Sequence, residues 1–255
     1  MVVSGRPWTP EERLIVLRFY LQTPFGRLHR GNQEIIAIAK QLNRSASSIA
    51  MKASNFASLD PKILGRGLKG LQGASEADRV LWEQMNQNKE WFARESEDAA
   101  TRLGLPGSEA VSAADLPRDI PTERLAEVTV RVAQSFFRKA VLAAYDDACA
   151  ISGLAVPALV NASHIIPWSK DEKRRADPTN GIALNALYDR AFDRGLISFD
   201  PQMKVMVSSR LKGEHVPEFH RTALLGIEGM EAARPIRFEA DPEALEYHRD
   251  VVFVN

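Results

Sequence analysis

The fold is decided by two neighbouring stretches of the chain, VNASHIIPW at residues 160–168 and NGIALNALYDRAFDRGLI at residues 180–197. The first stretch places His164 in a short apolar run, which predicts a strand that holds the imidazole on a rigid platform. The dipeptide Asn180-Gly181 predicts a turn, after which a second apolar run begins.

A short helix is expected over residues 184–194, with Gly195 as its terminating residue. Asp189 and Asp193 lie four residues apart, so both carboxylates project from one face of that helix. A strand hairpin with one histidine, packed on a helix with two carboxylates, is able to hold one divalent cation beside a general base.

This ordered set of residues resembles the HNH nucleases, which share the ββα-metal fold. His164 and Asn180 are 16 residues apart, and Asp189 and Asp193 follow Asn180 by 9 and 13 residues. In the family, the histidine that ends the first strand activates water, and the residues at the last two positions bind metal. The resemblance therefore implies that His164 and Asn180 are catalytic and that Asp189 and Asp193 bind a metal ion.

Flanking segments extend the resemblance to nearly the whole chain. Residues 131–138 and 149–153 are similar to the lead-in of a bacterial HNH subfamily with restriction-like members, and residues 207–250 are similar to its closing segment. Residues 24–27 and 55–60 resemble the N-terminal domain often fused to it. The resemblance implies an α+β protein with a helix-turn-helix-like N-terminal domain, a linker, and a C-terminal ββα-metal domain with a flanking helix and β-hairpin.

The chain departs from the family pattern at several positions. The third letter of the motif is Asp189 rather than histidine, and a carboxylate is a good ligand for Mg²⁺ or Mn²⁺. Ser163 stands where many relatives place an aspartate or histidine ligand, which leaves open whether this hydroxyl contributes to the metal site. Tyr188, Ser152 and Asn185 replace the residues of a stabilising zinc site, so no structural zinc is expected.

The bulk composition is that of a soluble globular protein. The chain has 255 residues, of which 45% are hydrophobic and 26% are charged, with a formal net charge of zero. A single cysteine, Cys149, excludes an internal disulfide and a cysteine-rich zinc knuckle. Neither a signal peptide nor an apolar run of membrane-spanning length is present, so we expect a cytoplasmic protein with no membrane partner.

The charge is unevenly distributed. Residues 1–72 contain eleven Lys and Arg against four Asp and Glu, whereas residues 73–120 contain five against ten. A basic first segment is compatible with nucleic-acid contact. We predict a helical DNA-binding domain at residues 1–103, a proline-containing linker at 104–122, and a nuclease domain at 123–255.

The first segment predicts a set of short helices. Cap residues and apolar runs indicate helices over about residues 9–22, 35–42, 45–56, 75–103 and 128–145. The second and third of these, joined by a short turn, resemble a helix-turn-helix. Its candidate DNA contacts are Arg44, Ser47, Ser48, Lys52 and Asn55. The alternative is a three-helix packing module whose polar face only meets water.

The predicted chemistry is hydrolysis of a phosphodiester with one metal ion. Neutral His164 removes a proton from the attacking water, and Asn180 ties the loop that orients the base. The metal ion stabilises charge on the phosphorane and on the leaving oxygen. Arg190 and Arg194, beside the two carboxylates, are candidate clamps for phosphate oxygens.

The leading interpretation is a restriction or modification-dependent endonuclease that acts on double-stranded DNA. One HNH site cuts one strand, so double-strand cleavage needs two copies and favours a homodimer. Two alternatives remain: a DNA-binding protein with a degenerate nuclease fold, and a nuclease toxin or RNase.

Overall fold

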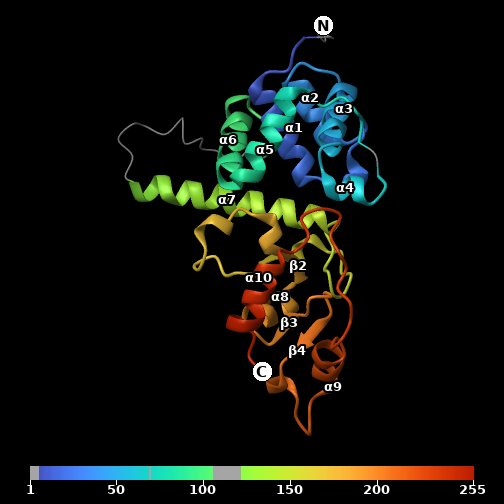
Figure 1. Ribbon diagram of the computed structural model, residues 1–255, viewed down its shortest axis with the longest axis vertical. Coiled ribbons are helices and arrows are strands. Elements are labelled where there is room, and N and C mark those ends of the chain that lie inside the picture. Colours follow the sequence, from blue (N-terminus) through green and yellow to red (C-terminus); the bar gives the residue numbers. More distant parts are fainter. Residues whose placement is uncertain (1–5, 69, 106–121) are drawn as a thin grey trace. The chain divides into compact units, whose positions relative to one another are not determined.

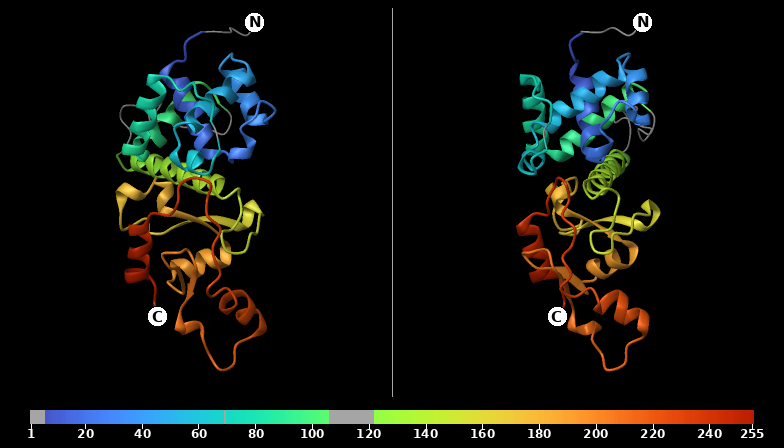
Figure 2. Two further views of the ribbon diagram at one scale, coloured as in Figure 1. Left: turned by 45° about the vertical axis from the view of Figure 1, so that its right-hand side comes forward. Right: turned by 90° about the vertical axis from the view of Figure 1, so that its right-hand side faces the viewer.

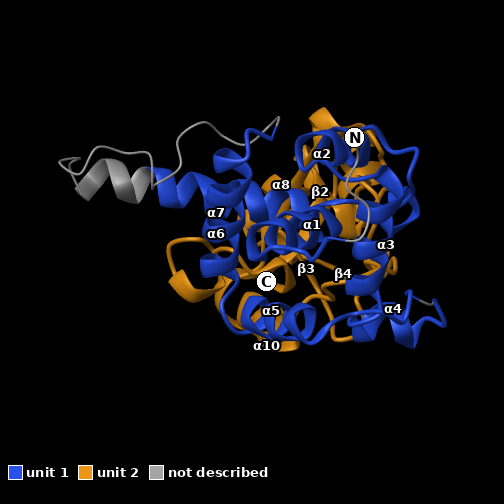
Figure 3. Cartoon of the chain, turned by 90° about the horizontal axis from the view of Figure 1, so that it is seen from above, with its two compact units in different colours: residues 1–140 blue, residues 141–255 orange. Residues whose placement is uncertain are grey.

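The computed structural model describes residues 6–68, 70–105 and 122–255, which form two compact units (Figure 1 and Figure 2). Unit 1 comprises Met1–Ala140 and unit 2 comprises Val141–Asn255 (Figure 3). Most of the predicted linker, residues 106–121, lies outside the described residues, and the predicted domain bounds stay predictions. No helix in the described ranges is long and apolar enough to cross a membrane.

Unit 1 is helical. Its elements are α1 (Pro10–Gln22), the 3₁₀ turn η1 (Phe25–Arg27), α2 (Gln33–Gln41), α3 (Ala46–Ala57), α4 (Pro61–Gly65), α5 (Glu76–Gln87), α6 (Lys89–Arg102) and most of α7 (Thr122–Ala144). The helix α1 packs on α3, α5 and α6, and α2 packs on α3. The stretch predicted as one helical segment at 75–103 is two helices, because Asn88 ends α5 and caps α6.

The start of α1 follows from its sequence. Thr9 and Glu12 form a capping box, and Pro10 occupies the first turn. Apolar side chains on α1 and α3, among them Tyr20, Leu17 and Phe56, are fully buried and form the core of the unit. Tyr20 also donates a hydrogen bond of 2.8 Å to Asp60, which caps α4.

Two buried ion pairs lie within unit 1. Arg44 donates to both carboxylate oxygens of Glu12, at 3.1 and 2.7 Å, and its guanidinium lies 3.9 Å from the Trp8 ring centre. Lys52 donates to Asp78 at 2.8 Å. Arg44 and Lys52 are only 6% and 5% exposed, so both positive charges are used in ion pairs between helices of unit 1.

Unit 2 is built around the two stretches that decide the fold. β1 (Val160–His164) pairs antiparallel with β2 (Gly181–Asn185), in a register that sets His164 opposite Gly181. α8 (Ala186–Asp193) follows β2 directly and packs on both strands. The predicted strand at His164 is confirmed, and the predicted helix starts two residues later than expected because β2 uses residues 181–185.

A second hairpin and a set of short helical turns complete unit 2. The hairpin pairs β3 (Ile197–Phe199) with β4 (Val205–Val207). The helical turns are η2 (Pro157–Leu159), η3 (Glu172–Arg174), η4 (Pro178–Asn180), η5 (Ser209–Leu211), α9 (Glu218–His220), η6 (Arg221–Leu225), α10 (Pro242–Tyr247) and η7 (His248–Val252). The mixture of helices and small antiparallel sheets agrees with the predicted α+β class.

Gly195 fixes how the chain leaves α8. Its φ is +66°, a conformation that glycine adopts without strain, and a Cβ there would lie 1.9 Å from the carbonyl oxygen of Val252. Val254 donates its backbone N–H to the Gly195 carbonyl at 3.0 Å. The end of the chain is therefore packed tightly against the end of α8.

His248 is a buried structural histidine in the same region. Its ring stacks on Phe192 with centroids 3.7 Å apart, and its Nε2 lies 3.2 Å from the Phe192 carbonyl oxygen. A carbonyl only accepts, so Nε2 carries the proton and Nδ1 accepts from the Ser198 hydroxyl at 2.9 Å. Burial lowers the pKa of His248 from 6.5 to about 4.

We expect unit 2 to lose stability on acidification already below pH 6.5. Below pH 6.5 the unfolded chain takes up a proton at His248 and the folded chain does not, so stability falls until pH 4, by about 3 kcal/mol at 1.36 kcal/mol per unit. Hydrogen exchange of the β1–β2 amides in the full chain, measured against pH, reports this loss. His248→Phe should flatten the dependence, and exposed His215→Ala should not; an equally steep profile in His248→Phe would contradict the assignment.

Candidate active site

His164 ends β1, and its ring is held by a main-chain carbonyl. The Nε2 atom lies 3.1 Å from the carbonyl oxygen of Arg175, and the ring makes an edge contact with Trp168 at 5.4 Å between centroids. Since the carbonyl only accepts, Nε2 carries the proton, and the neutral ring has its lone pair at Nδ1. Burial lowers the pKa of His164 below its ordinary value, although the hydrogen bond to Arg175 opposes this. The ring is thereby kept neutral, as a base must be.

The loop between His164 and β2 is closed by Asn180. The Asn180 side chain is 1% exposed; it accepts from the Ile166 N–H at 2.8 Å and donates to the Ile166 carbonyl at 3.1 Å. The Ile165 N–H donates to the Asn180 carbonyl at 2.9 Å. These bonds join the two ends of the loop, so the segment that carries the Arg175 carbonyl starts and ends at fixed points.

Asp189 on α8 is held by two side chains of β1. Ser163 donates its hydroxyl to Asp189 Oδ1 at 2.5 Å, and Asn161 donates its amide to Oδ2 at 2.8 Å. Asn161 and Ser163 are two residues apart on a strand and so share the face toward α8. Each carboxylate oxygen has a further lone pair, so Asp189 keeps the capacity to bind a cation in this orientation. Ser163 acts here as a hydrogen-bond donor to Asp189.

Asp193 lies one helical turn beyond Asp189. The residue as a whole is exposed, but partial desolvation of its carboxyl raises its pKa, and the charge of Asp189 raises it further. Arg190 and Arg194 are exposed beside it and act in the opposite direction. Desolvation is the larger cause of this raised pKa, and the smaller part due to Asp189 shows that the two negative charges repel each other, a repulsion that a bound cation would relieve.

The donor chemistry of these residues fits a hard divalent cation, with the two protein carboxylates as candidate ligands. Within residues 6–68, 70–105 and 122–255, no group of three or more His, Cys, Asp or Glu side chains is arranged to hold a metal ion. Mg²⁺ usually takes only one or two protein carboxylates and completes its shell with water and substrate phosphate. Asp189 and Asp193 are sufficient for such a site and insufficient for an all-protein cage.

Comparison with known families gives this region an identity. The family model described as HNH endonuclease matches residues 149–200. Residues 149–200 are therefore a domain of HNH type, called the HNH domain below. The match covers β1, the loop, β2, α8 and β3, and does not extend to unit 1 or beyond residue 200. No curated protein matches the chain.

The start of the HNH domain is held together by hydrogen bonding and packing. Asn185, which caps α8, donates its side-chain amide to the Ser152 hydroxyl at 3.1 Å. Tyr188 and Cys149 are buried, and burial raises the pKa of the Tyr188 hydroxyl. These contacts join the turn at residues 149–153 to the first turn of α8.

Outside the HNH domain, the predicted DNA contacts of unit 1 divide into two groups. Ser47 is exposed at the start of α3, and Ser48 and Asn55 are half-buried. Arg44 and Lys52 are buried in the ion pairs described above, so neither charge is presented at the surface. The ion pairs of Arg44 and Lys52 therefore give these two side chains a structural role in place of the predicted DNA contact.

The chain after α3 also limits the access to this helix. Gly70 lies so close that a Cβ would come within 2.3 Å of the Ser58 nitrogen, and Gly73 lies beside the Asn55 side chain. The Leu71 N–H donates to the Ser54 carbonyl at 3.1 Å. Residues 70–73 therefore lie on the second half of α3, and the first half is the more accessible.

Several residues of the HNH domain were missed by sequence reasoning. Asn161 was detectable, because it stands two residues before Ser163 and shares its strand face. The Arg175 carbonyl was not, since main-chain groups have no sequence pattern. The edge contact between Trp168 and His164 places this ring beside the candidate base.

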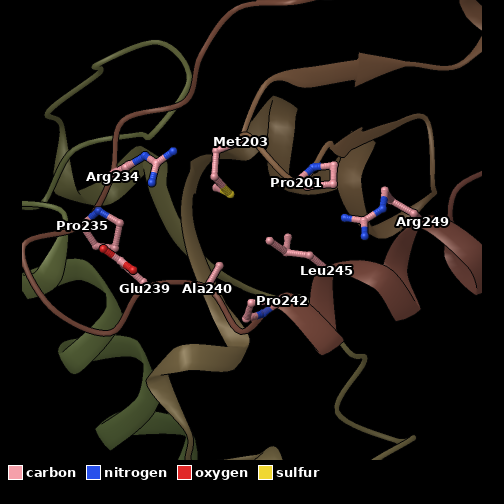
Figure 4. Close-up of a pocket in the computed structure, with 9 residues that line it drawn as sticks. All are labelled: Pro201, Met203, Arg234, Pro235, Glu239, Ala240, Pro242, Leu245 and Arg249. Carbon is pink, nitrogen blue, oxygen red and sulfur yellow. The ribbon is translucent and has the colours of Figure 1, made fainter.

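A cavity of about 200 Å³ lies elsewhere in unit 2 and contains none of these residues. Figure 4 shows Met203 and Leu245 near its middle, with the guanidinium groups of Arg234 and Arg249 on opposite sides. Arg249 also donates to the Phe199 carbonyl at 3.2 Å. This cavity is therefore separate from the candidate active site.

Proposed function

We propose that this protein is a metal-dependent DNA endonuclease that hydrolyses phosphodiester bonds at His164. The observation that carries the proposal is the anchoring of the His164 ring. His164 donates its Nε2 proton to the Arg175 carbonyl. On β1, His164 directly follows Ser163, which donates a hydrogen bond to Asp189. A histidine in this tautomer has its basic nitrogen at Nδ1, and the preceding residue on β1, Ser163, holds a carboxylate that would bind a metal ion.

His164 has the properties of a general base for water attack. The lone pair of Nδ1 takes the proton of the attacking water, and the positive charge that results stays on the imidazole. The lowered pKa of His164 keeps the ring neutral at ordinary pH, so the base is ready in most molecules. Asn180 supports this role indirectly, because it closes the loop that carries the Arg175 carbonyl.

A divalent cation, Mg²⁺ or Mn²⁺, would be held by Asp189 and Asp193. When bound, it supplies positive charge for the phosphate oxygens and for the leaving oxygen. Asn161 and Ser163 orient the Asp189 carboxylate through their hydrogen bonds. Arg190 on α8 and Arg194, the residue that follows its end, are exposed and would contact neighbouring phosphates.

The wider role proposed is that of a restriction or modification-dependent defence enzyme. Unit 1, with the exposed start of α3 and Ser47, Ser48 and Asn55, would contact double-stranded DNA while unit 2 cuts it. Cleavage of both strands would need two copies of the single site in unit 2, which favours a homodimer.

A DNA-binding protein with a degenerate HNH domain is the second candidate. Two observations favour it: no three-residue metal group occurs among the described side chains, and both oxygens of Asp189 already accept hydrogen bonds. The two candidates differ in whether added metal produces strand cleavage.

Purified full-length protein with supercoiled plasmid, in Mg²⁺, Mn²⁺ or EDTA, tests the proposal. We expect nicking with either metal and none with EDTA. Asp189→Asn should raise the Mg²⁺ concentration for half-maximal rate by at least about tenfold, whereas exposed Asp250→Asn should not change it. Plasmid that is bound but stays intact with every metal would instead support the degenerate domain.

A further inference from the structure

His164 is bonded through its ring to the loop between β1 and β2. The atom that holds its ring is the main-chain oxygen of Arg175, in the middle of the loop between β1 and β2. Asn180 ties the two ends of that loop but does not touch its middle. Something else must fix Arg175, because a shift of about 1 Å in a catalytic group is enough to lower a rate strongly.

Arg174, the neighbour of Arg175, is bound to the start of α10. Its guanidinium forms an ion pair with Asp241, and it donates to Glu243 at 3.2 Å. It also lies 3.4 Å from Asp171, at the start of the same loop turn. Figure 1 and Figure 2 show α10 next to this loop, and α10 lies beyond the segment that matches the HNH family.

Asp241, the partner of Arg174, is itself held by two hydrogen bonds. Asp241 caps α10 by accepting from the Glu243 N–H at 2.9 Å. Its own N–H donates to the Thr179 carbonyl at 2.9 Å, just before Asn180. One residue thus binds the middle of the loop through its side chain and the end of the loop through its backbone.

Contacts within the loop also hold Arg175 in place. Arg175 donates from Nε to the Trp168 carbonyl at 3.0 Å, and its guanidinium lies 5.2 Å from the Trp168 ring centre. The Trp168 ring in turn contacts His164. The Arg174 and Asp241 side chains are about one quarter exposed, so their pairing adds little stability, typically below about 1 kcal/mol. The main effect of the pairing is to fix the position of the loop that carries the Arg175 carbonyl.

We propose that Arg174 is a positioning residue: its ion pair with Asp241, at the start of α10, holds the Arg175 carbonyl where it orients the His164 ring. The inference rests on the proposed function, in which His164 is the general base. It assigns the C-terminal segment a part in the reaction that its position outside the family match does not suggest.

Cleavage kinetics give the first test, with Arg174→Gln, Arg174→Lys and the control Lys212→Gln. Lys212 forms an exposed pair with Glu228 in the same unit. We expect Arg174→Gln to lower kcat by roughly tenfold with KM unchanged, as for other groups that orient a catalytic residue. Arg174→Lys should retain most of the rate, and Lys212→Gln all of it. A raised KM with unchanged kcat would mean that Arg174 contacts DNA, and would overturn the inference.

The tautomer of the His164 ring gives a second test that needs no cleavage. In ¹⁵N NMR spectra of the full chain at alkaline pH, the wild type should show His164 with its proton on Nε2, identified by comparison with His164→Ala. Arg174→Gln should show a mixture of the two tautomers, and Arg174→Lys should restore the wild-type signal. An unaltered ring signal in Arg174→Gln would overturn the inference. A mixed signal in a protein that cuts no DNA would uphold the positioning and reject the proposed function.

Discussion

His164→Ala is expected to lower the rate of plasmid cleavage by roughly 10²–10⁴-fold, the range that a positioned general base contributes. The lone pair at Nδ1 is lost, and the Arg175 carbonyl has no equivalent group to orient. DNA affinity should change little, because His164 is a partly buried ring at the end of β1 rather than an exposed cation. Cleavage and filter binding on the same plasmid measure the two effects separately.

The matched control is His215→Ala, which removes an exposed histidine from the same unit. It should cleave at the wild-type rate, so that the loss in His164→Ala belongs to this position. The same loss of binding and of cleavage in His164→Ala would indicate a folding defect. Equal cleavage by His164→Ala and the wild type would place the active site elsewhere.

The pH dependence of cleavage by the wild type also tests the role of His164 as a base. The reaction needs neutral His164, and burial lowers the pKa of this ring below 6.5. The cleavage rate should therefore stay level through neutral pH and fall only at a pH below the ordinary histidine value. A rate that falls already above pH 6.5 would contradict the environment described for His164.

The HNH domain was the part of the fold most open to prediction from sequence. His164, Asn180 and Asp189 lie on elements shorter than nine residues, where each turn or cap residue has a strong local preference. The turn at Asn180-Gly181 and the helix end at Gly195 can be predicted from the residue types alone. The helix was predicted from residue 184 but α8 begins at Ala186, because the first part of this apolar run forms β2.

The contacts that position the site were not predictable in this way. Arg174 and Asp241 are 67 residues apart, and Arg44 and Glu12 are 32 apart. An arginine between two helices has the same appearance in sequence whether it faces a phosphate or a buried carboxylate. Only the packing of α1 against α3 shows which of the two Arg44 serves.

Arg44→Met is expected to destabilise unit 1 by about 3–5 kcal/mol, the usual cost of removing one partner of a buried ion pair. Glu12 would keep Arg6 but lose two hydrogen bonds from Arg44, and the Pro7 carbonyl would lose a donor at 2.8 Å. Urea unfolding of the full chain measures the loss. The exposed residue Lys40 on α2 provides the control, since Lys40→Met removes the same charge and should change stability by no more than about 0.5 kcal/mol.

The double variant Glu12→Leu, Arg44→Met should recover much of the lost stability, because apolar side chains replace a buried pair at little cost. Burial alone would raise the pKa of Glu12, but hydrogen bonds from Arg44, Thr9 and Arg6 hold it below 4.5. The stability that Glu12 contributes is thus complete above pH 4.5 and is lost as the pH falls through its folded pKa, so the double variant should be less sensitive to acid. If Arg44 contacted DNA instead, Arg44→Met would leave the free energy of unfolding unchanged and weaken DNA affinity. That result would contradict the structural role of the buried ion pair.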